Sequence, residues 1–293
     1  MKSLTLVFFL SLSFSWSRAA EEHWCYEVQV CGSNCLGPRR WNELGDCGRQ
    51  AQSPINIITH NLQHNTSLNA FTFVNYETAY LVNISNNGHS AKVDLAGQSI
   101  SGGGLSGSYN ALQLHLHWGS ENSTGSEHTI DGVQYPMELH IVHSKGATDL
   151  AVLGFFYEES TEENEAYKNI ISALANISYV GNWTSISSLK LKELIPEADD
   201  LKEYYRYKGS LTTPECSEIV TWTLFTKTIK LSKDQLKAFY EKLHYEHGLM
   251  EENFRPVQKL GNRIVQTSDA TTLLSQTLTM LIPLLVSCLL FTS

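Results

Sequence analysis

Hydrophobic and polar residues alternate with a period of two in several short segments between residues 71 and 224. Such alternation, in segments that are rich in branched and aromatic residues and separated by turn signals, predicts strands. The strands predicted in this way span residues 71–76, 79–84, 91–95, 113–118, 137–143, 150–157 and 219–224. We therefore expect a mainly β protein, a single domain on one large twisted, mostly antiparallel sheet.

Two further segments place apolar residues at helical spacing. The residues from Ser160 to Glu163 have the pattern of a capping box and precede an apolar stripe that ends at Leu174. A second capping box runs from Ser232 to Gln235 and precedes another such stripe. We expect both segments to form short peripheral helices that cover the sheet. Residues 21–51, dense in cysteine, glycine and tryptophan, predict an irregular segment held by disulfides.

The N-terminal end of the chain has a different composition. Residues 1–19 combine Lys2, an apolar run and small residues before Ala20, which is the pattern of a secretory signal peptide. A short core helix is the alternative, and the position at the extreme N-terminus disfavours it. We expect a secreted domain that spans residues 20–268.

The C-terminal residues 269–293 are mostly apolar from Leu278 to Phe291, with no Lys or Arg after them. An apolar run of about 14 residues is short for a bilayer-spanning helix, which needs roughly 20. A stretch of small polar residues before such a tail is typical of a GPI-attachment propeptide, with Ser268 as the attachment residue. A short transmembrane anchor is the alternative, which the lack of cytoplasmic positive charge disfavours.

Charge and cysteine content narrow the picture further. The chain of 293 residues has a formal net charge of -9 and no Lys/Arg cluster, which argues against a nucleic-acid partner. Without Cys288 of the tail, five cysteines remain, and two disulfides with one leftover thiol fit an oxidising compartment best. The N-glycosylation sequons are Asn65, Asn83, Asn122, Asn176 and Asn182. Of these, Asn83 lies in a predicted strand, where it is less accessible to glycosylation.

Three histidines are placed for a metal site by the strand pattern. Gln113, His115 and His117 share one face of their strand, and the other face holds Leu112, Leu114, Leu116 and Trp118. His140 shares a face with Glu138 and Val142, so it can reach the first two histidines if the strands are neighbours. A lone histidine on a half-buried strand is more often a satisfied core residue. Three neutral imidazoles with an open fourth position are typical of a catalytic zinc site.

The chain resembles the alpha-class carbonic anhydrases, specifically their secreted, GPI-anchored type IV-like members. The resemblance covers nearly the whole secreted domain and implies the fold of that family, Zn2+ as the cofactor, and reversible hydration of carbon dioxide to bicarbonate at the outer cell surface. The motifs that carry it are H-W-C-Y at His23, S-P-I-N-I at Ser53, N-N-G-H-S at Asn86, the two histidine strands, G-S-L-T-T-P at Gly209 and F-R-P-V-Q at Phe254.

The resemblance assigns zinc binding to His115, His117 and His140. It implies that Gln113, Glu138 and the backbone carbonyl of Asn253 each hold one ligand ring in orientation. Thr212 resembles the threonine that donates a hydrogen bond to Glu127 and orients the attacking hydroxide, with Thr213 beside it in the pocket. An apolar wall for carbon dioxide is implied at Val142, Val152, Leu211, Val220 and Trp222, whereas each of these residues taken alone favours core packing.

His89 resembles the residue that carries the proton away, since an imidazole titrates near neutral pH. From the sequence alone, a histidine after Asn-Gly is most often an exposed turn residue. Tyr26 and Asn87 resemble the residues that order the intervening water molecules. The remaining histidines are expected to be structural (His128 and His143) or on the surface (His60, His64, His244 and His247).

By the same resemblance, Cys47 pairs with Cys216 and Cys25 pairs with Cys35, whereas Cys31 departs from the family pattern.

Two other functions remain open. One is a non-catalytic binding module on the same fold, which the presence of all three histidines disfavours. The other is a zinc hydrolase that acts on esters.

Overall fold

The computed structural model describes residues 23–29, 35–121 and 123–268. The predicted signal peptide, the predicted C-terminal propeptide, Cys31 and the sequon at Asn122 lie outside the described residues. Within the described ranges, no helix is both long and apolar enough to cross a membrane.

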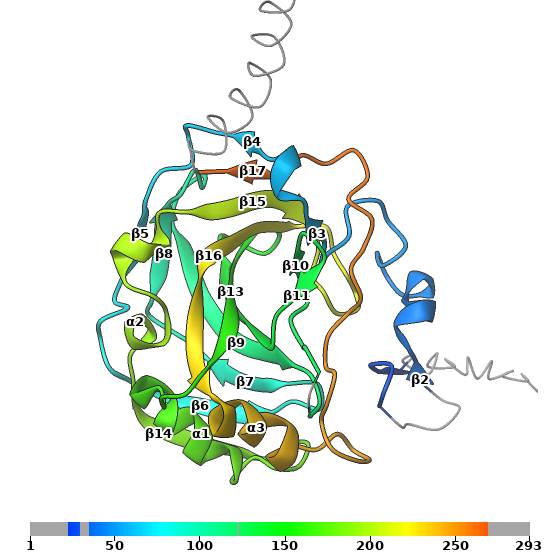
Figure 1. Cartoon of the computed structure of the whole chain (residues 1–293), viewed down its shortest axis with the longest axis vertical. Coiled ribbons are helices and arrows are strands. Elements are labelled where there is room, and N and C mark those ends of the chain that lie inside the picture. Colours follow the sequence, from blue (N-terminus) through cyan, green and yellow to red (C-terminus); the bar gives the residue numbers. More distant parts are fainter. Residues whose placement is uncertain (1–22, 30–34, 122, 269–293) are drawn as a thin grey trace, which may run out of the picture.

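One 12-stranded sheet runs through the molecule, as the alternating pattern predicted (Figure 1). Its main path has the order β14-β6-β7-β9-β12-β13-β16-β15-β17-β4, and β8 joins β5 to β9. Most neighbours are antiparallel, whereas β13–β16 and β17–β4 are parallel. These strands are β4 (Gln63–His64), β5 (Phe71–Val74), β6 (Tyr80–Asn86), β7 (Ala91–Asp94), β8 (Ser99–Gly102), β9 (Tyr109–Trp118), β12 (Met137–Ser144), β13 (Leu150–Ser160), β14 (Trp183–Leu189), β15 (Tyr204–Gly209), β16 (Val220–Ser232) and β17 (Gln266–Thr267).

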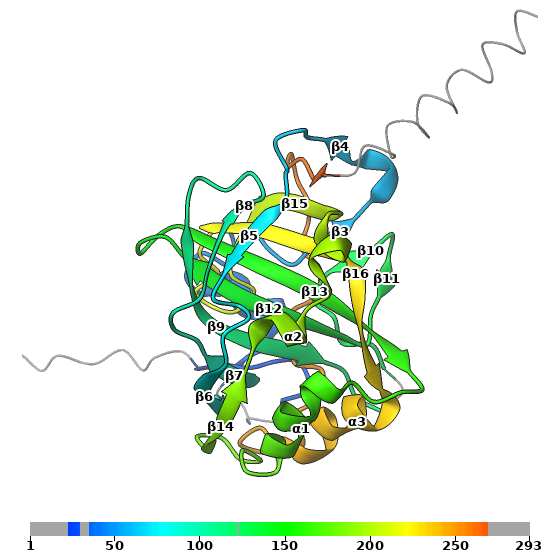
Figure 2. The same cartoon turned by 90° about the vertical axis from the view of Figure 1, so that its left-hand side faces the viewer.

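Smaller elements lie around this sheet. Strands β3 (Asn56–Ile57), β10 (Thr129–Ile130) and β11 (Val133–Gln134) form a three-stranded sheet. The short helices are η2 (Pro38–Glu43), η3 (Thr59–Asn61), η4 (Glu165–Tyr167), α1 (Lys168–Leu174), α2 (Leu191–Leu194), η5 (Ala198–Leu201) and α3 (Lys233–Lys242). Helices α1 and α3 pack together beside β14, at one end of the sheet, in both views (Figures 1 and 2).

The buried apolar side chains form two clusters. The larger contains Leu114, Leu116 and Trp118 from one face of β9. The smaller contains Val142, Val152 and other apolar residues, on the face of β12 that also carries His140. Full burial of a leucine contributes about 1.5–3 kcal/mol relative to exposure. The alternation of β9 therefore fixes which face of the strand the histidines occupy.

Leu112 does not follow the predicted alternation, because its side chain is 45% exposed. The ladder between β9 and β12 pairs Val142 with Gln113 and His143 with Ala111, so it passes over Leu112. A β-bulge of this kind places one residue outside the period-two pattern. The prediction that Leu112 shares the apolar face was wrong.

The two predicted helix starts had different outcomes. Ser232 caps α3 with a complete capping box, since its hydroxyl accepts from the Gln235 N–H and the Gln235 side chain accepts from the Ser232 N–H. By contrast, β13 continues to Ser160, so the predicted start at that residue was wrong. The cap lies at Asn164, whose Oδ1 accepts from the Ala166 N–H and opens η4 ahead of α1.

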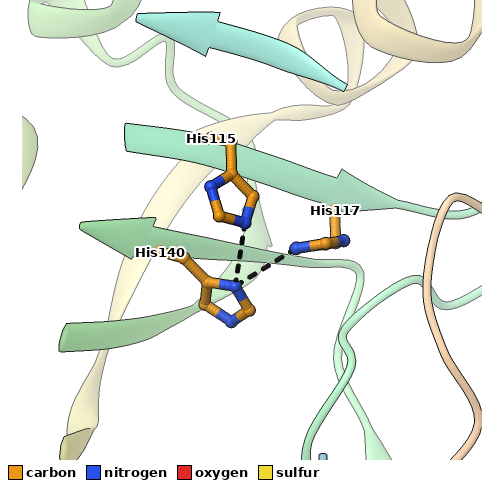
Figure 3. A group of neighbouring side chains, drawn as sticks. All are labelled: His115, His117 and His140. Carbon is orange, nitrogen blue, oxygen red and sulfur yellow. Dashed lines mark hydrogen bonds between the residues drawn. The ribbon is translucent and has the colours of Figure 1, made fainter. Parts of the chain in front are cut away.

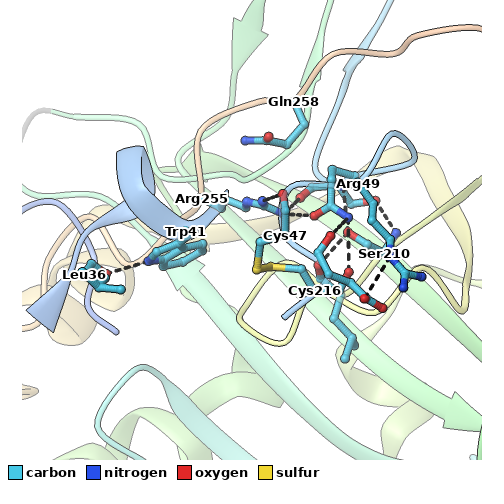
Figure 4. The surroundings of a disulfide bond; sticks show 12 residues. Leu36, Trp41, Cys47, Arg49, Ser210, Cys216, Arg255 and Gln258 are labelled. Atoms are coloured by element: carbon cyan, nitrogen blue, oxygen red, sulfur yellow. Dashed lines mark hydrogen bonds and ion pairs between the residues drawn. A yellow bond between two sulfur atoms is a disulfide. The ribbon is translucent and has the colours of Figure 1, made fainter. Parts of the chain in front are cut away.

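Both predicted disulfides are present. Cys25–Cys35 holds the N-terminal strands β1 (His23–Trp24) and β2 (Cys35–Leu36), which pair in parallel. Cys47–Cys216 joins the segment after η2 to the loop after β15 across a separation of 169 residues (Figure 4). The bridge therefore ties the N-terminal segment, which has little regular structure, to the body of the sheet.

Candidate metal centre

Three imidazole nitrogens converge on one point above β9 and β12 (Figure 3). The strands are antiparallel neighbours, and His140 lies directly opposite His115 in their register. Nδ1 of His140 is 3.1 Å from Nε2 of His117 and 3.3 Å from Nε2 of His115. Two nitrogens that bind one tetrahedral zinc ion at about 2.0–2.1 Å lie roughly 3.3 Å apart. The spacing of the three nitrogens therefore fits a shared zinc ion.

The other nitrogen of each ring already has an oxygen partner. Nδ1 of His115 lies 2.9 Å from Oε1 of Gln113, and Nδ1 of His117 lies 2.7 Å from the carbonyl oxygen of Asn253. Nε2 of His140 lies 2.7 Å from Oε1 of Glu138. An amide, carbonyl or carboxylate oxygen accepts a proton, so these outer nitrogens carry the N–H. The three inner nitrogens are then left with lone pairs that face one another, an arrangement that a cation stabilises.

Burial also favours the unprotonated rings. It lowers the pKa of His115 well below the ordinary value, and the neighbouring His117 and His140 lower it further. Burial likewise lowers the pKa of His117, although Glu127 acts in the opposite direction. Neutral imidazole is the form that binds zinc. The ligand set is therefore prepared for a metal near neutral pH.

A second group of possible ligands consists of His128, Glu138 and His140. Its atoms are already hydrogen-bonded to one another or to neighbours. Oε1 of Glu138 lies 2.7 Å from Nδ1 of His128, and Oε2 accepts the backbone N–H groups of Glu127 and His128. Nε2 of His128 lies 2.6 Å from the Tyr207 hydroxyl. This group is a hydrogen-bonded support for His140, which leaves the three converging histidines as the better metal site.

Gly154 makes room for this support. It pairs with His140 across β12 and β13. A Cβ atom at this position would lie 3.3 Å from Oε1 of Glu138 and would clash with Leu224. The lack of a Cβ at Gly154 thus leaves room for the Leu224 side chain and for the close approach of the carboxylate. The sequence pattern did not identify Gly154, His128 or Tyr207, because their contacts arise only when distant strands meet.

Glu127 is placed differently from the prediction. Its Oε1 accepts the backbone N–H of Arg255, and its Oε2 is buried without a hydrogen-bond partner in the described part of the chain. That oxygen lies 3.4 Å from Nε2 of His117. The predicted donation from the Thr212 hydroxyl to Glu127 is therefore not found, although Thr212 is buried. An unpaired carboxylate oxygen beside the converging nitrogens is a further feature that suits a cation.

A cavity of about 130 Å³ opens at the centre and is lined by His115, His117, Thr213 and the three residues of the predicted proton route, Tyr26, Asn87 and His89. The His89 ring stacks on Trp24 with ring centroids 3.7 Å apart, so it is not the exposed turn residue that its sequence context suggested. Asn87 fixes the turn, because its Oδ1 accepts the backbone N–H of His89. Burial, with a smaller contribution from His23, lowers the pKa of His89 to about 4 in this orientation.

The predicted apolar wall lies behind the ligands. Val142, Val152, Val220 and Trp222 are buried in one cluster, and Leu211 packs against it. The Trp222 ring lies 4.8 Å from the His140 ring, measured between centroids. Among the residues that line the cavity at the centre, none belongs to this group. The structure thus shows these residues packed around the site and leaves their contact with a substrate as a prediction.

The Cys47–Cys216 bridge positions the loop that carries Thr213. The backbone N–H of Cys216 donates to the Thr213 carbonyl, and the Gln52 side chain donates to the Cys216 carbonyl. Arg255 contacts the same region, since its Nη1 donates to the Gln52 side chain and its guanidinium lies over the Trp41 ring (Figure 4). The disulfide therefore restrains one wall of the cavity.

The residues outside the centre are placed as follows. His143 is buried on the opposite face of β12, where it contacts the Tyr76 hydroxyl at 2.6 Å. His60 and His247 are exposed, and His64 and His244 are partly exposed, as the predicted surface positions require. Asn83 is exposed, and the expectation of poor access was wrong; Asn176 and Asn182 are exposed and Asn65 is half-buried.

The sheet and the three converging imidazoles define a β protein with a three-histidine metal site. The family model of the eukaryotic-type carbonic anhydrases matches residues 36–269, and the chain belongs to this family. Carbonic anhydrase 4 of Oryctolagus cuniculus is 44% identical over 268 residues, which are 86% of each chain. Carbonic anhydrase 4 of Rattus norvegicus is 42% identical over 97% of each chain. Carbonic anhydrase 12 of Homo sapiens is 38% identical over 79% of this chain and 71% of its own.

Proposed function

We propose that this carbonic anhydrase is a zinc enzyme that catalyses the reversible hydration of carbon dioxide to bicarbonate and a proton at the outer cell surface. One observation carries the zinc assignment. Nε2 of His115, Nε2 of His117 and Nδ1 of His140 converge, while the outer nitrogen of each ring faces an oxygen acceptor. Family membership supports the reaction, and the geometry supports these three side chains as the ligands.

Zinc bound at these nitrogens would act as a Lewis acid and make hydroxide available at neutral pH, as is established for carbonic anhydrases as a class. The chain contributes the orientation of the ligands. Gln113, Glu138 and the Asn253 carbonyl hold the three rings so that their lone pairs point inward. Oε2 of Glu127 places negative charge beside His117, which offsets part of the positive charge of the metal.

The apolar cluster around Trp222 supports a substrate without charge. Carbon dioxide has no net dipole, so a site for it needs apolar surface more than an ionic clamp. Trp222 packs against His140, and Leu211 lies at the partly exposed margin of the same cluster. We assign Thr213, which lines the cavity, and Leu211, at the margin of the apolar cluster, to the substrate side of the metal centre. We do not assign the orientation of the nucleophile to a Thr212–Glu127 hydrogen bond, because Glu127 accepts no hydrogen bond from the Thr212 hydroxyl.

His89 is the proposed carrier of the product proton. It lines the cavity together with His115 and His117, and it is the lining imidazole that does not belong to the three converging rings. Burial of the ring, with a smaller contribution from His23, lowers its pKa in the orientation stacked on Trp24. We therefore propose that the ring leaves Trp24 when it accepts the proton, and that Tyr26 and Asn87 hold the water molecules between.

Stopped-flow measurement of carbon dioxide hydration tests the reaction, with metal content determined on the same preparation. The purified secreted domain should contain one zinc ion per chain and hydrate carbon dioxide. Removal of zinc with a chelator should abolish the activity, and added zinc should restore it. Full activity in a preparation without metal would contradict the proposal.

The proposed location at the cell surface depends on the predicted signal peptide and on GPI attachment at Ser268. The Ser268 hydroxyl donates to the Lys202 carbonyl and accepts the Tyr204 N–H, so an anchor there would leave directly from the folded domain. Phosphatidylinositol-specific phospholipase C should release the protein from intact cells. Resistance to release, with membrane retention after alkaline extraction, would favour the transmembrane alternative.

A further inference from the structure

We propose that a cavity beside β15 and β17 binds a small phosphate- or sulfate-bearing molecule. None of the three converging histidines lines this cavity. This cavity, called the basic cavity below, has a volume of about 410 Å³. It shares no lining residue with the cavity at the metal centre. Its charged lining residues are Arg206, Lys208, Arg263 and Asp149.

The basic cavity carries the opposite charge to the protein as a whole. Three cationic side chains face one carboxylate in its lining, whereas the chain has a formal net charge of -9. The single carboxylate, Asp149, accepts a hydrogen bond from the Tyr109 hydroxyl at 2.7 Å. Arg206, Lys208 and Arg263 take part in none of the ion pairs found among the described residues. Clustered cations without carboxylate partners attract an anion.

Arg206 is the strongest indication of an anion site, because it is only 6% exposed and lies over the Phe71 and Tyr204 rings, and none of the ion pairs among the described residues includes it. Its Nε and Nη2 both donate to the Thr223 hydroxyl. Its Nη1 makes no hydrogen bond within the described residues, and it lies 3.7 Å from the Cβ position of Gly104, another lining residue. Neutral groups thus hold the guanidinium in place and leave one nitrogen directed to the cavity wall.

Neutral oxygens also surround the other two cations. Nζ of Lys208 donates to the Thr221 hydroxyl at 2.6 Å. The Arg263 guanidinium donates to the carbonyls of Leu260, Lys208 and Lys259, and it lies over the Tyr207 ring. Guanidinium groups bind tetrahedral oxyanions with paired N–H donors, and a lysine adds a point charge. An oxyanion between these groups would add counter-charge to that of Asp149 in the lining and of Glu218, which interacts with Arg263.

The uncharged residues of the lining indicate the chemistry of the uncharged part of the ligand. A cavity of 410 Å³ lies in the range that holds small organic molecules. Hydroxyl and amide groups from Ser67, Ser106 and Gln266 stand beside the apolar side chains of Leu105 and Ile264. This mixture suits a polyhydroxy body with apolar C–H faces. The expected ligand class is therefore a phosphorylated or sulfated monosaccharide.

Isothermal titration calorimetry on the zinc-loaded protein tests the site, with glucose 6-phosphate as the probe and glucose as the neutral comparison. N-linked glycans are removed first, because the sequon residue Asn65 also lines the basic cavity. We expect saturable binding of one glucose 6-phosphate per chain and none of glucose. Lys208→Gln should weaken binding about tenfold or more, since one charge-assisted contact is lost. The matched control Lys237→Gln, on the exposed face of α3, should bind as the parent does.

A second pair of measurements separates this site from the metal centre. Lys208→Gln should hydrate carbon dioxide at the parent rate, which shows that the variant is folded, and Arg263→Gln should lose binding in the same way. Undiminished binding in both variants would overturn the proposal and assign the anion elsewhere. Binding only to phosphatidylserine vesicles, without binding of the soluble probe, would also overturn it and make the surface a membrane contact. Failure of this proposal would leave the zinc assignment untouched.

Discussion

Nδ1 of His128 lies 2.7 Å from Oε1 of Glu138, the same carboxylate oxygen that lies 2.7 Å from Nε2 of His140. Two imidazoles therefore share one acceptor, and only one of them belongs to the converging set. The Tyr207 hydroxyl contacts the far nitrogen of His128 and donates to the Ser53 hydroxyl. The orientation of His140 thus depends on a buried chain of polar groups that runs from the ligand to the segment before β3.

Replacement of Glu138 by Gln should weaken zinc binding by about 10- to 100-fold, the range typical of partners that orient a metal ligand. The amide keeps the size of the carboxylate but cannot accept from both imidazoles with the same strength. Burial raises the pKa of Glu138, but its interactions with His128 and His140 outweigh burial and hold that pKa well below the usual range, so the native group is the carboxylate. Competition with a chromophoric chelator measures the zinc affinity.

The exposed residue Glu241, on α3, provides the control for this substitution. Glu241→Gln should leave zinc affinity unchanged and report any general effect of removing a negative charge. An unaltered affinity in Glu138→Gln would show that the carboxylate does not position His140.

Strand periodicity predicted that His115 and His117 lie side by side, whereas the approach of His140 also required the two strands to be neighbours in the sheet. His115 and His117 must share a face because the side-chain period of a strand is two, and Gln113 shares that face for the same reason. The large sheet and the Ser232 capping box follow from equally local patterns. The predictions drawn from patterns in the residues depended on positions close together in the sequence, whereas the Cys47–Cys216 pair and the Asn253 partner of His117 were implied by the resemblance.

The features that the sequence could not predict depend on long-range contacts. The backbone N–H of Arg255 reaches Glu127 across 128 positions, and no local pattern indicates such a bond. Leu112 was misassigned because a bulge shifts the register of the ladder. The helix start at Ser160 was misplaced because pairing with β16 extends β13 through a segment with good capping residues. In each case tertiary pairing overrides the local preference.

Replacement of His89 by Ala should slow turnover about tenfold or more at low buffer concentration, since a general acid–base group is lost. Added imidazole buffer should restore most of the rate. Stopped-flow hydration at two buffer concentrations measures both effects. His247→Ala, which removes an exposed histidine, is the control, and an unchanged buffer dependence in His89→Ala would exclude the proposed role.

The stacking on Trp24 leads to a separate prediction for the His89 ring. Burial holds its pKa at about 4, below the ordinary value near 6.5. Trp24→Ala should expose the ring to water, so the pKa should rise toward the ordinary value. Titration of the His89 ring by NMR measures the change. A pKa that stays near 4 in Trp24→Ala would mean that other groups cause the depression.

Loss of the Cys47–Cys216 bridge should destabilise the protein more than loss of Cys25–Cys35. The Cys47–Cys216 bridge joins residues 169 positions apart, whereas the Cys25–Cys35 bridge joins residues 10 positions apart. A disulfide that closes a longer loop restricts the unfolded chain more. Serine at both positions of the long bridge should lower the free energy of unfolding by about 2–5 kcal/mol. Urea denaturation of the two double variants gives the comparison, and equal losses would contradict this account.

The most direct test of the central claim is anomalous X-ray diffraction at the zinc absorption edge from crystals of the zinc-loaded protein. We predict one strong peak about 2.0–2.1 Å from Nε2 of His115, Nε2 of His117 and Nδ1 of His140. A peak between His128 and Glu138 instead, or no peak at the three converging nitrogens, would contradict the assignment of the metal centre.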